Sequence, residues 1–170
     1  MLYHFSEEAG IKTFIPRPNR SFPHLKPAVW AIDQEHAPHY YFPRDCPRVI
    51  YWKSETSTAE DIDLFFKYSS ADKIMIIENR WLERLRDTRL YVYGFDPKDF
   101  NLFEEAKTAG YYISHKEVKP VQVEVIDDLL GRLLEQPIEL RFTPTLGLIR
   151  NAVIQSTLDF SIIRYSNATK

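Results

Sequence analysis

The segment Lys73-Ile74-Met75-Ile76-Ile77-Glu78 decides the expected fold, because an unbroken apolar run between two charged residues is typical of a central, buried strand. Other apolar or alternating runs predict strands at residues 1–5, 28–32, 48–52, 90–95, 111–114, 121–126 and 138–142. Helical spacing predicts fewer helices, which are a short one at residues 33–41, one at 58–68, two that begin near 79 and 128, and one at 147–158. Strands outnumber helices without strict βαβ alternation, so the sequence predicts an α+β fold with mixed or antiparallel sheets and flanking helices.

The connections carry further local signals. Residues 6–15 are expected to form a turn of helix followed by an extended piece, and residues 19–27 a surface loop that could cover a cleft. Residues 97–110 are expected to form an acidic loop. Thr58 and Asp61 resemble a capping box, with Asp in the acidic place, at the start of the 58–68 helix.

Composition limits the classes of partner. A chain of 170 residues fits a single domain over residues 1–170, and its 24 acidic and 22 basic side chains nearly cancel. Nucleic acid is therefore an unlikely partner, and no apolar run is long enough to cross a bilayer. The N-terminus lacks the pattern of a secretory signal, so we expect a cytoplasmic location. One cysteine excludes an internal disulfide.

Two groups of side chains predict a ligand site. His4 and Ser6 are two residues apart on the expected first strand, so both should project from the same side. The rings of Tyr40 and Tyr41 could stack on a planar ligand. The alternative is structural: backbone groups would satisfy His4, and both tyrosines would pack against the strand that contains Trp30.

The segment Arg44-Asp45-Cys46-Pro47-Arg48 admits three interpretations. Arg44 and Arg48 could bind an anionic ligand, since a guanidinium group holds phosphate or carboxylate through two hydrogen bonds. Asp45 could instead pair with one of them in a rigid turn. Cys46 could act as a nucleophile if the two arginines lowered its pKa.

A metal site is not predicted. His36 and His39 are three residues apart, but a catalytic zinc needs a third protein ligand held in fixed geometry. Either His4 or His24 would have to supply that ligand from far away in the sequence. We therefore expect His36 and His39 to lie on a solvated helix face.

Five segments carry a resemblance to a small uncharacterised bacterial family. They are Tyr3–Glu8, Val29–Asp33, Pro43–Val49, Gly110–Ser114 and Ser156–Arg164. The first contains His-Phe-Ser-Glu-Glu and the third Pro-Arg-Asp-Cys-Pro-Arg-Val. The resemblance spans nearly the whole chain and implies no particular activity.

The chain is also distantly similar to ADP-ribosyltransferase-like domains, which implies that fold and NAD as a substrate. In those domains a histidine on the first strand binds a ribose, a tyrosine after a later strand stacks on nicotinamide, and a glutamate from a third strand orients the acceptor. His4 matches the first position, and Tyr41 or Tyr40 the second. Where the glutamate is sought the chain has Tyr-Tyr-Ile-Ser, so Glu117 or Glu124 nearby would have to serve.

The expected function is therefore binding of NAD or another nucleotide in a cleft near His4 and Tyr41, with Glu117 as a third catalytic partner. RNA 2′-phosphotransferases share the fold pattern and rely on arginines, which would give Arg44 or Arg48 a role. A module without catalytic activity, which binds a protein or small molecule through its aromatic residues, is the remaining alternative. The oligomeric state stays open.

Overall fold

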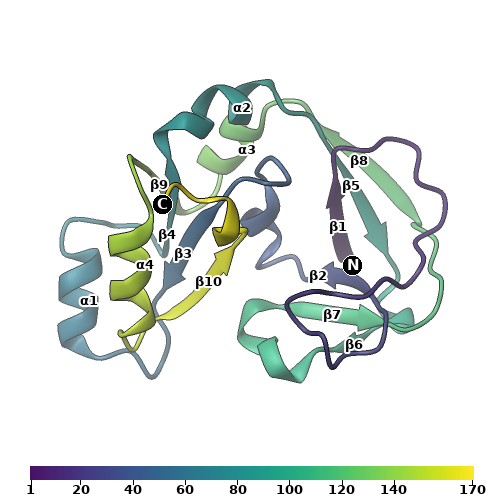
Figure 1. Ribbon diagram of the computed structural model, residues 1–170, viewed down its shortest axis with the longest axis horizontal. Coiled ribbons are helices and arrows are strands. Elements are labelled where there is room, and N and C mark those ends of the chain that lie inside the picture. Colours follow the sequence, from purple (N-terminus) through teal and green to yellow (C-terminus); the bar gives the residue numbers. More distant parts are fainter. The chain divides into compact units, whose positions relative to one another are not determined.

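The computed structural model describes residues 1–170, which divide into two compact units (Figure 1). The first unit comprises Met1–Tyr41 and Arg89–Asp127, and the second comprises Phe42–Thr88 and Asp128–Lys170. Each unit contains one sheet, and all strand pairs but one are antiparallel. The predicted α+β class, with mostly antiparallel sheets and few helices, is confirmed. A single domain over residues 1–170 stays a prediction.

The first unit is built on a six-stranded antiparallel sheet with the order β6-β7-β2-β1-β5-β8. Its strands are β1 (Leu2–Ser6), β2 (Val29–Ile32), β5 (Leu90–Phe95), β6 (Asn101–Leu102), β7 (Tyr111–Ser114) and β8 (Gln122–Ile126). A short 3₁₀ helix, η1 (Ala37–Tyr40), follows β2, and two others, η3 (Pro97–Asp99) and η4 (Glu104–Ala109), lie between strands of this sheet. The strand β1 lies in the middle of the sheet, so its side chains alternate between two covered faces.

Each face of this sheet carries its own apolar cluster. On one face Leu2, Tyr93 and Phe95 pack with Phe14 from the loop that follows β1. On the other face Trp30 packs with residues that include Phe103. The loop containing Phe14 forms no helix, contrary to the prediction for residues 6–15. Its backbone instead forms two hydrogen bonds with the Tyr93 hydroxyl. This hydroxyl accepts one from Ile11 N and donates one to Glu8 O.

The second unit is built on a four-stranded sheet with the order β10-β3-β4-β9, in which only β4 and β9 are parallel. Its strands are β3 (Arg48–Trp52), β4 (Lys73–Glu78), β9 (Ile138–Thr143) and β10 (Asp159–Ile163). Its helices are α1 (Ala59–Phe66), η2 (Asn79–Trp81), α2 (Leu82–Asp87), α3 (Leu129–Leu134), α4 (Gly147–Ile154) and η5 (Tyr165–Asn167). The predicted central strand at residues 73–78 is confirmed.

Helices α1 and α4 cover one face of the second sheet (Figure 1). The shared core consists of Val49 and Tyr51 of β3, Ile74 and Ile76 of β4, Phe65 and Phe66 of α1, and Val153 of α4. Helix α3 contacts β9 and α2. The longest α-helices, α1 and α4, have eight residues each, so none has the length needed to cross a membrane.

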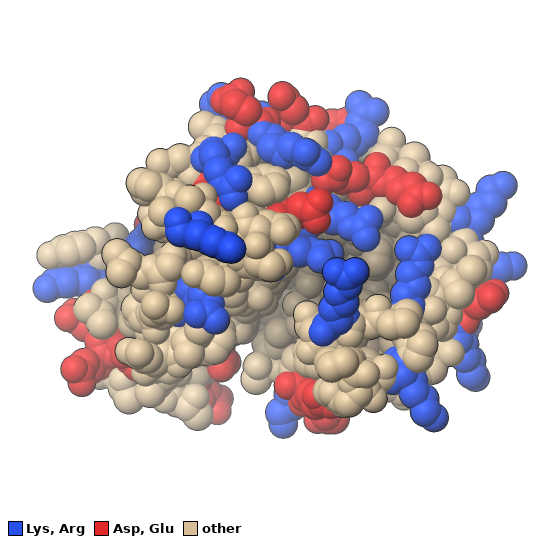
Figure 2. Space-filling model, in the orientation of Figure 1, with Lys and Arg blue, Asp and Glu red and all other residues tan.

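Charges of both signs are spread over the surface. Lys and Arg side chains share the face shown in Figure 2 with Asp and Glu side chains. This distribution agrees with the formal net charge of −2.

One of the two hydrogen bonds of the predicted capping box at α1 is confirmed, and the other is not formed. Thr58 Oγ1 accepts a hydrogen bond from Asp61 N, as predicted. The Asp61 carboxylate does not complete the box, because it accepts bonds from Thr157 N at 2.7 Å and Thr157 Oγ1 at 2.6 Å. Thr157 also accepts from Thr58 N. Helix α4 ends at Ile154, short of the predicted 158, and this threonine instead anchors the start of α1.

The Asp61 contacts predict a pH dependence of stability. The two Thr157 bonds hold the pKa of Asp61 below its usual range, so folding favours the ionised carboxylate. The ionised Asp61 contributes its full stabilisation above the pKa of an ordinary carboxyl group. This stabilisation is lost as the pH falls through the lower pKa that Asp61 has in the folded protein. We expect Asp61→Asn to lower Tm at pH 7 and to make Tm fall less steeply below about pH 4.

Thermal unfolding followed by circular dichroism across this pH range measures the effect. Asp63→Asn is the matched control, because Asp63 is an exposed residue of the same helix. It should follow the wild-type pH profile. If Tm depended on pH in the same way for the wild type and for Asp61→Asn, the stabilising role given to the Asp61 carboxylate would be contradicted.

Candidate functional site

Strands β1 and β2 are neighbours in the first sheet but pair at one position only, Tyr3 with Ile32. If the ladder continued, Phe5 would lie opposite Trp30. Instead the His4 Nδ1 atom lies 2.9 Å from the carbonyl oxygen of Trp30. A carbonyl only accepts, so Nδ1 carries the hydrogen and donates it. The His4 side chain therefore joins the two strands where their backbone ladder ends.

His4 and Ser6 project from the face of β1 that carries the Phe14 cluster, in keeping with the alternation of the strand. The His4 ring meets the Phe14 ring edge-on, with 4.9 Å between centroids. Ser6 is buried, and its Oγ accepts a hydrogen bond from Glu8 N at 3.0 Å. Both polar side chains thus have a local structural role in addition to any contact with a ligand.

Five aromatic residues, which we call the aromatic chain, lie in series on the opposite face of β1. The Phe5 ring stacks on Tyr40 at 6.1 Å and meets Tyr41 edge-on at 5.5 Å. The hydroxyl groups of Tyr40 and Tyr111 are 2.8 Å apart, and the Tyr111 ring contacts Trp30 at 5.9 Å. Both Tyr40 and Tyr41 are only partly buried. The series therefore reaches the surface at these two rings.

These contacts locate the predicted residues relative to β1. His4 and Phe5 are successive residues of the strand, so their side chains leave opposite faces. Tyr40 and Tyr41 both contact Phe5. The structure brings the two tyrosines together and places their rings on the other side of β1 from the His4 imidazole.

A tight turn positions the two tyrosines. Asp33 Oδ1 accepts from His36 N and lies 2.8 Å from His36 Nδ1, while Asp33 N donates to Gly110 O. Gly110 has a φ of 72°, and a Cβ on this residue would lie 2.3 Å from His36 Nδ1. Asp33 therefore organises the chain before η1, although the short helix predicted for residues 33–41 is reduced to a single 3₁₀ turn.

The prediction that His36 and His39 lie on a solvated helix face is wrong, since both are buried. His36 pairs with Asp33, and its ring packs edge-on against His39 at 5.3 Å. The structure has no group of three or more His, Cys, Asp or Glu side chains that could hold a metal ion. His36 and His39 therefore contribute to packing beside the tyrosine turn.

The predicted carboxylate lies apart from the strands. Glu117 is an exposed residue in the segment that follows β7. Strand β7 is the neighbour of β2, so the elements that carry His4, the tyrosines and Glu117 follow one another in the sheet. A catalytic role for Glu117 stays a prediction.

Arg44 and Arg48 belong to the second unit and have different surroundings. Arg44 is exposed, whereas Arg48 is 2% exposed. The Arg48 guanidinium donates to the Cys46 carbonyl oxygen at 2.7 Å and lies 5.1 Å from the centre of the Phe42 ring. These contacts favour a structural role for Arg48, and the binding of an anion by either arginine stays a prediction.

Cys46 is fully buried. The pKa of its thiol is raised to about 12, chiefly by burial; Glu78 also raises it, whereas Arg48 and Arg80 lower it by less than burial raises it. The thiol is therefore protonated at neutral pH. This environment does not favour the nucleophile interpretation of the segment.

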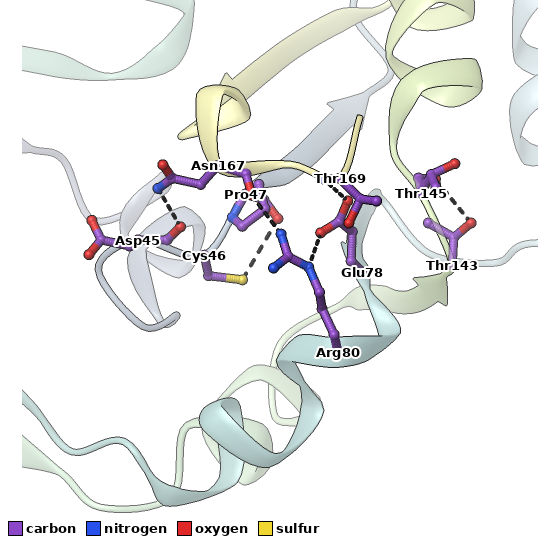
Figure 3. A network of polar contacts seen from close by, with 9 residues as sticks. All are labelled: Asp45, Cys46, Pro47, Glu78, Arg80, Thr143, Thr145, Asn167 and Thr169. Carbon is purple, nitrogen blue, oxygen red and sulfur yellow. Dashed lines mark hydrogen bonds and ion pairs between the residues drawn. The ribbon is translucent and has the colours of Figure 1, made fainter.

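Sequence reasoning missed a polar network around Glu78, the last residue of β4 (Figure 3). Glu78 is fully buried, and its carboxylate accepts from Arg80 Nε and from Thr169 N, both at 2.7 Å. Arg80 also donates to Asn167 O, and the Asn167 side chain donates to Asp45 O. The network ties the C-terminal segment to the end of β4. Nothing in the sequence distinguishes Glu78 from an ordinary exposed strand end.

Comparison with known proteins identifies the kind of chain to which these features belong. The protein belongs to the family described as "Family of unknown function (DUF6886)", whose model matches residues 3–168. The predicted membership of an uncharacterised family is thereby confirmed for nearly the whole chain. No curated protein and no solved structure matches the chain.

Gly110 offers a test of how the tyrosine turn is held. Gly110→Ala adds a clash with His36 and Asp33 to the strain of a left-handed conformation, which alone costs about 1–2 kcal/mol. Gly10→Ala is the matched control, because Gly10 has the same φ of 72° and a Cβ there would have no other atom within 4 Å. Chemical denaturation should show a larger loss of stability for Gly110→Ala. Equal losses would mean that the turn does not need the close approach.

Cys46 offers a test of burial in the second unit. We expect its thiol to react with an aromatic disulfide reagent only when the protein unfolds, because the native thiol is both covered and protonated. Absorbance of the released thiolate, measured with and without denaturant, gives the two rates. Rapid stoichiometric reaction of the native protein would overturn this description of Cys46.

Proposed function

We propose that the first unit binds NAD or a related nucleotide at the point where β1 and β2 separate, as an ADP-ribosyltransferase-like domain. The observation that carries the proposal is the strand order β1-β2-β7. It sets side by side the histidine strand, the strand that leads to the tyrosines, and the strand that precedes Glu117. These are the three elements from which the resemblance draws its ligand contacts.

The single pairing between β1 and β2 supports this location. Beyond Tyr3 the two strands exchange no further ladder bonds, and the His4 imidazole supplies the next bond between them. A ligand seated at this point can meet His4 from one face and the Phe5–Tyr41 side from the other. One ligand could then contact both His4 and Tyr41, although their side chains lie on opposite faces of the sheet.

His4 would contact the ligand through its second ring nitrogen. Nδ1 is directed at the Trp30 carbonyl oxygen, which fixes the orientation of the ring and makes Nε2 the acceptor in the neutral imidazole. A ribose hydroxyl is a suitable donor to that atom. Tyr41 or Tyr40 would stack on the nicotinamide or adenine ring, because aromatic side chains order a planar ligand at low entropic cost.

Transfer chemistry, if it follows binding, would take place at the nicotinamide ribose. The glycosidic bond breaks and its electron pair leaves with nicotinamide, while an acceptor oxygen or nitrogen bonds the ribose C1′ and gives up its proton. Glu117 is the carboxylate proposed to take that proton and to stabilise the positive charge that develops on the ribose.

A binding module without turnover is the second candidate. It is supported by the absence of any carboxylate in β7, whose residues are Tyr111-Tyr112-Ile113-Ser114. The aromatic chain serves this candidate equally well, since binding through stacking needs no general base. The binding module could take a protein or another small molecule in place of NAD, and it would not release nicotinamide.

Binding is tested by thermal shift and calorimetry with NAD, ADP-ribose and nicotinamide. Ligand at about 100-fold above Kd should stabilise the protein by about 2.7 kcal/mol. His4→Asn should fold normally but lose this response, because its amide can still donate to the Trp30 carbonyl oxygen and offers nothing in place of Nε2. His115→Ala is the matched control, since His115 Nδ1 also bonds a backbone carbonyl in this unit, that of Pro27.

Two results would contradict the binding proposal. One is a folded wild-type protein that millimolar NAD and ADP-ribose fail to stabilise. The other is a His4→Asn variant that responds as the wild type does.

Tyr41→Ala should also weaken binding, whereas Tyr68→Ala should not, because Tyr68 is 92% exposed on the second unit. Nicotinamide release, followed by chromatography, then separates the enzyme from the binding module.

A further inference from the structure

The strand β8 lies at the edge of the six-stranded sheet. It pairs with β5 on one side and ends the sheet on the other. Val121, Val123 and Val125 are 62%, 52% and 46% exposed, and the intervening Gln122 and Glu124 are exposed as well. An exposed strand edge with apolar side chains is a template for pairing with another strand.

The sequence of this edge is complementary to itself in one register. An antiparallel pairing with a two-fold axis at Val123 places Val121 opposite Val125 of the second copy. The same register sets Gln122 opposite Glu124, and all four of these residues lie in or next to β8. Apolar residues thus meet apolar residues, and an amide meets a carboxylate.

The neighbouring two-fold registers lack this complementarity. An axis at Glu124 would place that carboxylate directly opposite its own copy, and like charges in this position are destabilising. An axis between Val123 and Glu124 would set a valine against a carboxylate. Charge and apolarity therefore favour the axis at Val123 over these two registers.

We propose that β8 pairs with β8 of a second copy of this chain, antiparallel and centred on Val123, so that two six-stranded sheets become one continuous sheet. A strand pair of this length buries less surface than most stable dimers, so the dimer dissociates on dilution.

Cysteine cross-linking tests the register. Val123→Cys puts a thiol on the two-fold axis, where directly opposite Cα atoms are about 4.5–5.5 Å apart and within reach of a disulfide. Mild oxidation should then give a covalent dimer on a non-reducing gel. Val121→Cys is the matched control, because its counterpart lies four residues further along the strand, roughly 13 Å away.

The control excludes random collision as the cause of cross-linking. Val121 is more exposed than Val123, so collision would cross-link Val121→Cys at least as fast. The native Cys46 is fully buried and does not compete in the folded protein. The double variant Val121→Cys, Val125→Cys should cross-link again, since these two positions face each other. Equal rates for the two single variants would overturn the proposed register.

Sedimentation measurements test the dimer itself without a cross-link. The wild-type protein should shift from monomer to dimer as its concentration rises. Val123→Lys should abolish the shift by placing two cations on the axis. Circular dichroism confirms that the variant is folded. A wild type that stays monomeric at millimolar concentration, or a Val123→Lys variant that associates equally well, would refute the proposal.

Discussion

The hydrogen bond from His4 to the Trp30 carbonyl oxygen is the contact on which the arrangement of the first unit depends. Strands β1 and β2 occupy the middle of the sheet, yet their backbones pair at only one position. The imidazole supplies a bond where the ladder ends, and it does so with a fixed ring orientation. The Nδ1 atom of His4 thus holds the two strands together, and its Nε2 atom is the proposed ligand contact.

Most strands could be predicted from the sequence because their local patterns are strong. The apolar run at residues 73–78 and the runs at 28–32 and 90–95 form strands close to the predicted bounds. The strand at Asp159–Ile163 was missed, although its first four residues alternate between polar and apolar, because it is short and directly follows residues predicted as helix. Division into two sheets was also not predictable, because it results from pairings between segments far apart in the sequence.

The candidate site could be predicted only as a list of residue types. His4 and the two tyrosines stood out because they combine polar and aromatic groups near the N-terminus. Strand alternation alone predicts that His4 and Phe5 lie on opposite faces. The contacts of Phe5 with both tyrosines could not be predicted, because they depend on tertiary packing. The burial of Glu78 and its bond to Thr169 likewise depend on how the C-terminal segment folds back, which no local pattern records.

The tautomer of His4 is the property that tests the central claim most directly. A long-range proton–nitrogen correlation spectrum of the ¹⁵N-labelled protein, recorded where histidines are neutral and assigned with His4→Asn, reports which ring nitrogen carries the hydrogen. The account predicts a protonated Nδ1 and an unprotonated Nε2, with the Nε2 resonance shifting when NAD is added. A hydrogen on Nε2 alone would contradict the bond to Trp30 and the role that the account gives to this histidine.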